Sequence, residues 1–318
     1  MLAVPRRRRK MPDCIGATRR YTGGDVPLPR AADKRVPAPL NVAAAIAILV
    51  TTGIPGTPAP AAAQSRDRPI PHDVGQSVSP SFEGWYPNDD GTFTLSFGYF
   101  NRNYEQVLDI PVGPDNRFEP GPADRGQPTH LLSRRQTGVF TVTVPADFGD
   151  RTLTWSLTAG GETFAVPGHL RPEWRIDALH EVTSGNRPPV LSFEPEGSAS
   201  NVGQGPAGVR QALAARAGEP VTVTLWARDD GVKKRPSENP PVLGVAWSKF
   251  RGPGAVTFAD PNPEIDEDGR TTTVVTLAEP GDYVLRALAW DDSGGQGPVM
   301  AAGFQCCWTN AYLDVRVE

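Results

Sequence analysis

Short runs of alternating apolar and polar residues dominate the chain from about residue 81 to its end. A period of two indicates β-strands with one buried face, and the turn-forming residues between the runs indicate hairpins. Residues 88–91 (Asn-Asp-Asp-Gly) predict one hairpin turn, because Asp-Gly tolerates positive φ, and Gly160-Gly161 predicts another. The predicted inward rows of the first half are Phe93, Leu95, Phe97 and Tyr99, then Phe140, Val142 and Val144, then Leu153, Trp155 and Leu157.

A second set of alternating runs follows residues 167–189, where four prolines interrupt the pattern. Val209 to Ala217 is the one segment there that we interpret as a brief helical turn, ended by Gly218. The pattern predicts an all-β fold with two β-sandwich domains in tandem, residues 77–167 and 190–318, joined by a linker at 168–189. The first domain is assigned to the sandwich class by its strand spacing alone.

The first 63 residues carry the pattern of an export signal. Val42 to Val50 is a continuous apolar run, with three basic residues between 30 and 35 before it and three alanines at 61–63 after it. This order is typical of a Sec signal peptide, and the run is too short to cross a bilayer of about 30 Å. We therefore expect a basic extension and signal peptide over 1–63, then a linker over 64–76. The alternative is a disordered basic tail ahead of an internal anchor.

Three quoted stretches and a closing strand resemble a known family over residues 217–317. They are AGEPVTVTLWARDDG, VAWSKFRGPGAVTF and EPGDYVLRALAWDDSGG. They resemble a bacterial immunoglobulin-like domain of the PKD type. The resemblance implies that Trp247 is the buried tryptophan of the third strand and that Tyr283 is a corner tyrosine, whose hydroxyl bonds to upstream backbone. The chain lacks the Trp-Asp-Phe-Gly-Asp-Gly-like run of many such domains. Because this fold hosts many functions, the resemblance implies only an adhesive or accessory binding module.

Charge and localisation narrow the classes of partner. The formal net charge is −4, and a basic excess lies only within residues 1–35. Nucleic-acid binding by the folded part is disfavoured, because phosphate recognition needs a positive field there. We expect a periplasmic or secreted protein that does not span the membrane after removal of its leader.

Cys306 and Cys307 are the most unusual feature, because the only other cysteine, Cys14, lies in the predicted leader. We place a vicinal disulfide at this pair as a candidate site. Across a trans peptide the two Cα atoms would lie about 3.8 Å apart, below the usual disulfide range. Two free thiols, one in the core and one semi-exposed, are the first interpretation of this pair and come ahead of the disulfide, and metal capture or an intermolecular bridge comes third.

An aromatic and amide cluster is the candidate ligand-binding site. Aromatic faces beside Asn and Arg can stack on sugar rings and hydrogen-bond their hydroxyls. Core packing with a polar turn is the alternative. The candidate residues are Trp85, Tyr86, Asn101, Arg102, Asn103 and Tyr104, next to Tyr99 and Phe100.

No catalytic or cofactor site is predicted. Residues 264–275 begin with Glu and end with Val, so they fail the EF-hand spacing, and acidic turns explain this segment and the paired aspartates at 229–230 and 291–292. The Asp-Ser-Gly-Gly run at 292–295 follows Asp291 instead of the glycine of a protease motif. None of the four histidines has metal-ligand spacing.

The leading hypothesis from sequence is a non-catalytic envelope or extracellular protein that binds a glycan or a protein. A structural spacer or assembly subunit is the second hypothesis. A metal- or thiol-dependent envelope protein that uses the two adjacent cysteines is the third.

Overall fold

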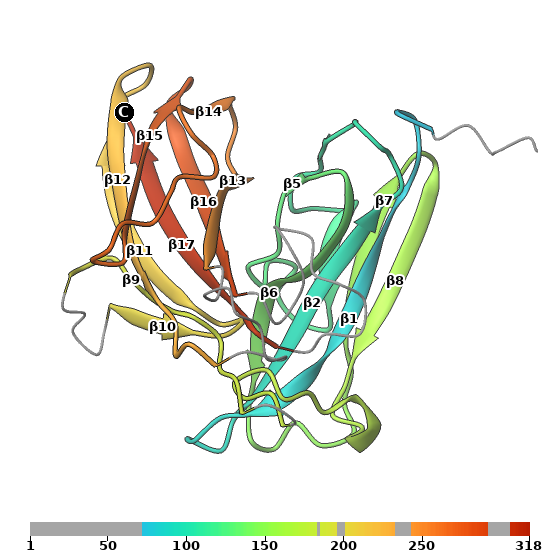
Figure 1. The fold of residues 1–318 in the computed structure, drawn as a ribbon. Helices are drawn as coiled ribbons and strands as arrows, with labels where there is room; N and C mark the ends of the chain where they lie inside the picture. The colour runs from blue at the N-terminus through green and yellow to red at the C-terminus, as the bar shows by residue number, and fades with distance from the viewer. Residues whose placement is uncertain (1–71, 183–184, 196–200, 233–242, 292–305) are drawn as a thin grey trace, which may run out of the picture. The chain divides into compact units, whose positions relative to one another are not determined.

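The computed structural model describes residues 72–182, 185–195, 201–232, 243–291 and 306–318. The predicted leader, residues 64–71 of the predicted linker and the Asp-Ser-Gly-Gly run lie outside these residues. Within them, every regular element is a β-strand except one short 3-10 turn, η1 (Pro172–Trp174) (Figure 1). No helix in this described part is long and apolar enough to cross a membrane. The predicted all-β fold with two sandwiches is confirmed.

The first sandwich consists of two three-stranded sheets and a small two-stranded sheet. One sheet has the order β1-β2-β6, the second has the order β4-β7-β8, and β3 pairs with β5. The bounds are β1 (Val78–Pro87), β2 (Phe93–Asn101), β3 (Leu108–Asp109), β4 (Asn116–Glu119), β5 (His130–Leu131), β6 (Arg134–Val144), β7 (Leu153–Ala159) and β8 (Glu162–Gly168).

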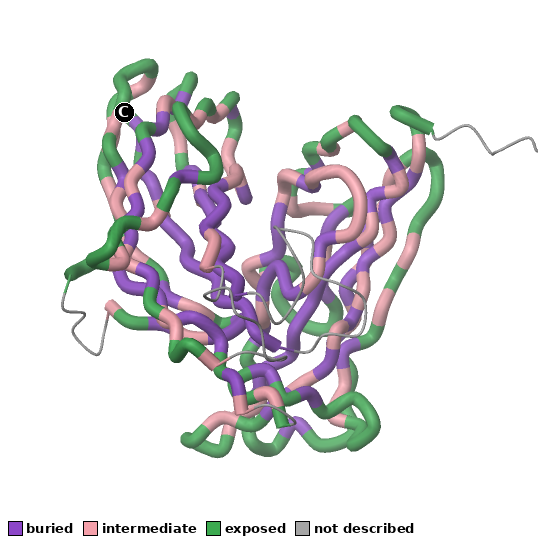
Figure 2. The backbone as a smooth tube through the Cα atoms, viewed as in Figure 1, coloured by how far each residue is buried: buried purple, intermediate pink, exposed green. Residues whose placement is uncertain are grey.

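An aromatic cluster forms the centre of the first core. The ring centroids of Phe97, Phe118 and Phe140 lie 6.2, 5.9 and 4.9 Å from that of Trp155. Trp155 is fully buried, and its indole N–H donates to Asn116 Oδ1 at 3.0 Å. Figure 2 shows the buried stretches, in purple, running along the strands of both sandwiches. Large aromatic residues therefore fill this core, as the inward rows of the sequence indicate.

Both predicted hairpin turns of the first sandwich are confirmed. Asn88 N–H donates to Thr92 O at 2.9 Å, and Gly91 has φ of +83°. Gly160 and Gly161 have φ of +61° and +78° and form the two-residue connection between β7 and β8. Positive φ at both central residues is the geometry that matches the twist of a two-residue hairpin.

The second sandwich packs a five-stranded sheet, β10-β9-β12-β15-β14, against a four-stranded sheet, β11-β17-β16-β13. Leu225, Val275 and Leu285 are fully buried between them. The bounds are β9 (Val190–Ser192), β10 (Val202–Gln204), β11 (Val209–Ala215), β12 (Pro220–Arg228), β13 (Gly244–Arg251), β14 (Val256–Phe258), β15 (Arg270–Leu277), β16 (Gly281–Trp290) and β17 (Trp308–Val317).

The helical turn predicted over Val209 to Ala217 is wrong, because this segment forms strand β11. It pairs in parallel with the C-terminal strand β17, from Val209 opposite Ala311 to Ala215 opposite Val317. Its side chains alternate between more buried odd-numbered and exposed even-numbered positions. The helix propensity of its alanine, leucine and arginine residues is overridden by pairing with a strand about 100 residues away.

The two residues singled out by the family resemblance occupy the expected places. Tyr283 donates its hydroxyl hydrogen to Glu279 O at 3.0 Å and accepts a hydrogen bond from Gly254 N at 3.0 Å. Trp247 is 4% exposed and stacks near Phe258 in the second core. The hydroxyl of Tyr283 therefore joins the start of β16 to two loops, as in a corner tyrosine.

Strand β17 also bonds to the first sandwich. Trp308 Nε1 and Asn310 Nδ2 both donate to Gly138 O, at 3.2 and 2.9 Å, and Tyr312 Oη donates to Val139 O at 2.8 Å. These acceptors lie in β6, where Gly138 has φ of +56°. Residues 65–318 form one compact unit.

Replacement of Tyr283 by Phe tests the corner tyrosine. We expect the variant to lose about 2 kcal/mol of unfolding free energy, because the buried N–H of Gly254 is left without its acceptor. Urea denaturation measures this loss. Tyr104→Phe is the control. Because Tyr104 is 48% exposed, loss of its hydroxyl group should change the free energy of unfolding by less than about 0.5 kcal/mol. Equal stability of both variants would contradict the assignment.

Alanine at Gly138 tests the contact between β17 and β6. A Cβ atom there would collide with the indole ring of Trp308, and the residue would also keep a positive φ. We expect a loss of about 3 kcal/mol, since overpacking adds to backbone strain. Gly161→Ala is the matched control, because its φ is also positive but no atom lies within 4 Å of the added Cβ. This control should lower the free energy of unfolding by about 1 kcal/mol. Urea denaturation of both variants measures the two losses.

Candidate functional site

Five planar side chains of the first sandwich alternate between aromatic ring and guanidinium group. The Cζ atom of Arg102 lies 4.6 Å from the ring centroid of Phe164 and 5.9 Å from that of Phe100. The Cζ atom of Arg134 lies 5.1 Å from the centroid of Phe100 and 4.0 Å from that of Tyr104. All four distances are within the range of cation–π attraction. We call these five residues the arginine–aromatic ladder.

Strand pairing assembles the ladder from three separate segments, which are residues 100–104, the start of β6 and β8. Phe100 lies in β2 and Arg102 follows that strand, and both flank the buried Asn101, so they share the opposite face. Arg134 begins β6, where it is the partner of Asn101. Phe164 comes from β8, in the other sheet. Sequence reasoning missed Arg134 and Phe164, because neither is near the cluster along the chain.

Asn101 and Asn103 have a structural role. Both are fully buried. Asn101 Nδ2 donates to Gln106 O at 2.9 Å and Leu131 O at 3.1 Å, while its Oδ1 accepts from the backbone N–H of Asn103 at 3.1 Å. Asn103 exchanges hydrogen bonds with the backbone of Gln76, at 2.9 and 2.6 Å. These amides therefore hold the loop that carries Arg102 and Tyr104, and they face no solvent.

Trp85 and Tyr86 do not join the ladder. Trp85 donates its indole N–H to Arg171 O at 2.8 Å and packs edge-on against Phe93. Tyr86 is 5% exposed and packs with the buried residues Ile176 and Ala178. Burial raises the pKa of Tyr86 to about 12. Of the six sequence-predicted ligand residues, the structure brings only Arg102 and Tyr104 together at the ladder.

Arg134 has an unusual backbone conformation. Its φ of +64° makes it the one non-glycine residue with positive φ in the described segments. An L-residue in this left-handed region costs about 1–2 kcal/mol relative to ordinary conformations. Such strain tends to gather at functional sites. The guanidinium group of Arg134 donates to Arg102 O at 3.3 Å, so the two arginines of the ladder are directly connected.

The two ladder arginines differ from the other arginines that contact rings. Arg151 lies 5.3 Å from the centroid of Phe148 and also pairs with Asp147 at 3.0 Å. Arg210 lies 4.9 Å from the centroid of Tyr312 and also pairs with Asp314. Neither Arg102 nor Arg134 forms an ion pair with any residue that the structure describes. The ladder therefore holds two positive charges that no described carboxylate neutralises.

Cys306 and Cys307 are bonded to each other in a disulfide just before β17. The peptide bond between them is cis, whereas the sequence argument assumed a trans bond. Both residues are buried, at 2% and 0% exposure, and Cys307 Sγ lies 3.7 Å from Asn186 O. A buried and bonded pair offers no accessible thiolate for metal capture or for a bond to another chain.

The acidic loops form no metal site in the described residues, where no group of three or more His, Cys, Asp or Glu side chains is placed to hold an ion. Burial, together with the nearby carboxylates of Asp291 and Asp230, raises the pKa of Asp229 to about 6. Asp266 Oδ1 accepts hydrogen bonds from Asp268 N and Arg270 N at 3.1 and 2.8 Å, which is the behaviour of a turn residue. The second aspartate of the 291–292 pair lies outside the described residues.

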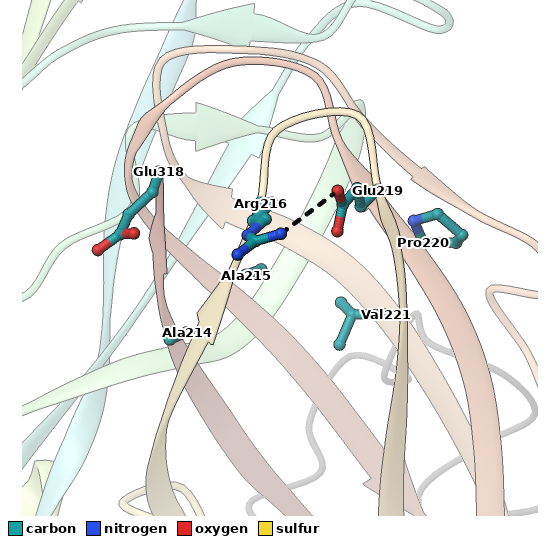
Figure 3. A pocket seen from close by; sticks show the side chains of 7 residues that line it. All are labelled: Ala214, Ala215, Arg216, Glu219, Pro220, Val221 and Glu318. Carbon is teal, nitrogen blue, oxygen red and sulfur yellow. Dashed lines mark ion pairs between the residues drawn. The ribbon is translucent and has the colours of Figure 1, made fainter.

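A pocket at one end of the second sandwich has fewer groups than the ladder that could bind a ligand. Figure 3 shows its lining, in which Arg216 and Glu219 form an ion pair of 3.9 Å. Glu318 and four small or aliphatic residues complete the wall. Its one basic side chain already has a carboxylate partner, and the lining contains no aromatic ring.

Comparisons with known proteins give structural matches only. No family model and no curated protein matches the chain. A solved structure of the S-layer protein rSbsC(31-844) matches with 12% identity and a TM-score of 0.21, over 76% of this chain and 28% of that chain. The D00-D0 domain of intimin matches with 10% identity and a TM-score of 0.23, over 75% and 99% of the two chains. The D0-D1 domain of intimin matches with 12% identity and a TM-score of 0.22, over 76% and 97%.

Two substitutions at Arg134 separate backbone strain from side-chain contacts. Arg134→Gly and Arg134→Ala both remove the guanidinium group, but only glycine adopts φ of +64° freely. We expect the glycine variant to be more stable than the alanine variant by about 1 kcal/mol in urea denaturation.

The same two substitutions at Arg135 are the control. This neighbour has no positive φ, so there the alanine variant should be the more stable, by about 0.5–1 kcal/mol. If alanine were also the better residue at position 134, the backbone of Arg134 would not be strained.

Proposed function

We propose that this chain is an exported, non-catalytic protein of the bacterial envelope that binds a glycan through the arginine–aromatic ladder. The observation that carries the proposal is the contrast between two kinds of arginine. Arg151 and Arg210 contact both a ring and a carboxylate, whereas Arg102 and Arg134 contact rings but no carboxylate among the described residues. Stacked guanidinium groups with unused donors are suited to polar, planar or carboxylate-bearing ligands.

Export is supported by two features of the chain. The apolar run at 42–50 followed by alanines at 61–63 has the order of a signal peptide. The disulfide between Cys306 and Cys307 supports an oxidising location, since such bonds persist outside the cytoplasm. We infer that the mature protein is located in the periplasm or outside the cell. We also infer that its second domain is an immunoglobulin-like domain of the PKD type.

A structural or assembly role is the second candidate, and strand β11 favours it. This strand lies at the edge of its sheet and pairs with β17 on one side only. An edge strand presents backbone groups to which another strand can pair. The charged side chain of Arg210 on this edge is a feature that opposes such pairing.

Glycan binding is tested with the purified protein on a glycan array and in pull-downs with peptidoglycan and capsular polysaccharide. We expect binding to at least one glycan, weakened at least about tenfold in the double variant Arg102→Ala/Arg134→Ala, because charge-assisted hydrogen bonds are lost. The double variant Arg151→Ala/Arg210→Ala removes two other ring-contacting arginines and should bind like the wild type. Absence of binding to every glycan, or full binding by the ladder variant, would overturn the proposal.

A further inference from the structure

We infer that the ligand of the arginine–aromatic ladder is an acidic glycan whose sugar rings carry carboxylates, that is, a polyuronate. This inference rests on the proposed function and names its ligand class. It is carried by the unused hydrogen-bond donors of the two arginines, by the rings that hold them, and by the charge of the surrounding protein.

Most of the donors on the two guanidinium groups are unused within the described structure. A guanidinium group has five N–H donors in a planar fork. Arg102 uses one of them on Ser77 Oγ at 3.2 Å, and Arg134 uses one on Arg102 O at 3.3 Å. Both side chains are partly exposed. Each fork therefore keeps donors for a bidentate bond to one carboxylate, which is the strongest pairing open to arginine.

The rings fix the two forks before any ligand arrives. The ring centroid of Phe100 lies within 5.9 Å of both guanidinium carbons, and the centroids of Phe164 and Tyr104 lie 4.6 and 4.0 Å from those of Arg102 and Arg134, respectively. Arg134 is further restricted by its backbone φ of +64°. A ligand that meets ordered side chains loses less conformational entropy on binding. Lysine has no planar group to stack in this way, so it is not an equivalent residue here.

The arrangement favours a charged sugar over a neutral one. Neutral sugars bind aromatic faces, but all three rings of the ladder are already in contact with guanidinium groups. Tyr104, at 48% exposure, is the ladder residue whose ring is most accessible. The groups that remain available to a ligand are therefore mainly the two guanidinium groups, with the phenol ring of Tyr104 beside them to contact a sugar.

The charge of the protein argues against a nucleic acid. Residues 65–318 contain 22 Lys and Arg but 33 Asp and Glu, so the ladder is a local basic site in an acidic chain. The acidic protein would repel any long polyanion, and a nucleic acid most strongly because every nucleotide carries a phosphate. A short uronate segment that presents two carboxylates to the ladder acts only within about 8–10 Å, where the two guanidinium groups are the nearest charges. An acidic peptide is the competing ligand. It is disfavoured because protein interfaces rely on desolvated apolar anchors, whereas the groups that the ladder leaves free are the charged donors of two guanidinium groups.

Isothermal titration calorimetry with matched probes tests the inference on the purified protein. The probes are oligosaccharides of polygalacturonate, alginate and hyaluronate, each with its carboxyl-reduced, neutral counterpart of equal length. We expect at least one polyuronate to bind, and its reduced counterpart to bind at least about tenfold more weakly, because each fork loses its anionic partner.

Charge-preserving variants show whether the planar forks are needed. Arg102→Lys and Arg134→Lys keep the positive charge but lose the bidentate geometry, so each should weaken binding of the polyuronate about tenfold. Arg151→Lys is the control, because that arginine has its own carboxylate partner, and it should leave the affinity unchanged. Circular dichroism on each variant checks that the sheets are intact.

The outcomes separate this inference from the proposed function. If a polyuronate and its carboxyl-reduced form bound equally, or if only neutral glycans bound, the ligand class would be overturned while glycan binding stood. Equal affinity for poly-glutamate would assign the ladder to acidic peptides and would also overturn it. Equal loss of binding in all three lysine variants, the Arg151→Lys control included, would show that binding does not depend on the two ladder arginines in particular and would overturn the inference. If no glycan of any kind bound, both proposals would fail.

Discussion

Strand β17 is the constraint on which the rest of the described structure depends. It pairs with β16 on one side and with β11 on the other, so the four-stranded sheet is built around it. Three of its side chains, Trp308, Asn310 and Tyr312, bond to carbonyl groups of β6 in the first sandwich. Strand β6 also begins with Arg134 and pairs with β2, which carries Phe100. The same strand therefore receives the contact with the second sandwich and supports the ladder.

Local patterns in the sequence were sufficient for the strands named in the inward rows and for the two hairpin turns, and the family resemblance implied the corner tyrosine. Each depends on residues close in the chain: alternation within a strand, glycines at a two-residue turn, or Tyr283 four residues after its acceptor Glu279. Strand β11 could not be predicted in this way, since its pairing with β17 joins Val209 to Ala311. Its composition alone favours a helix, and only the distant partner decides against it.

Only part of the candidate site could be predicted from the sequence, again because the pairing of distant strands decides which residues meet. Asn101 and Asn103 are residues typical of a sugar-binding site, but strand pairing buries both of them. Their side-chain amides hydrogen-bond to backbone groups and to each other. Arg102 and Tyr104 remain at the surface, and the residues that complete the ladder, Arg134 and Phe164, come from β6 and β8. A contiguous cluster in the sequence thus separates into a buried support and an exposed site.

Stability alone does not explain the ladder. Two like charges contact one ring of Phe100, and one of them belongs to a residue whose backbone conformation costs about 1–2 kcal/mol. A nearby carboxylate would offset part of the repulsion, and Arg151 and Arg210 show that this chain pairs other ring-contacting arginines in that way. An arginine without such a carboxylate partner is expected at a site where a ligand supplies the missing interaction. External carboxylates bound to the guanidinium groups of Arg102 and Arg134 would neutralise the two charges for which the described residues supply no carboxylate.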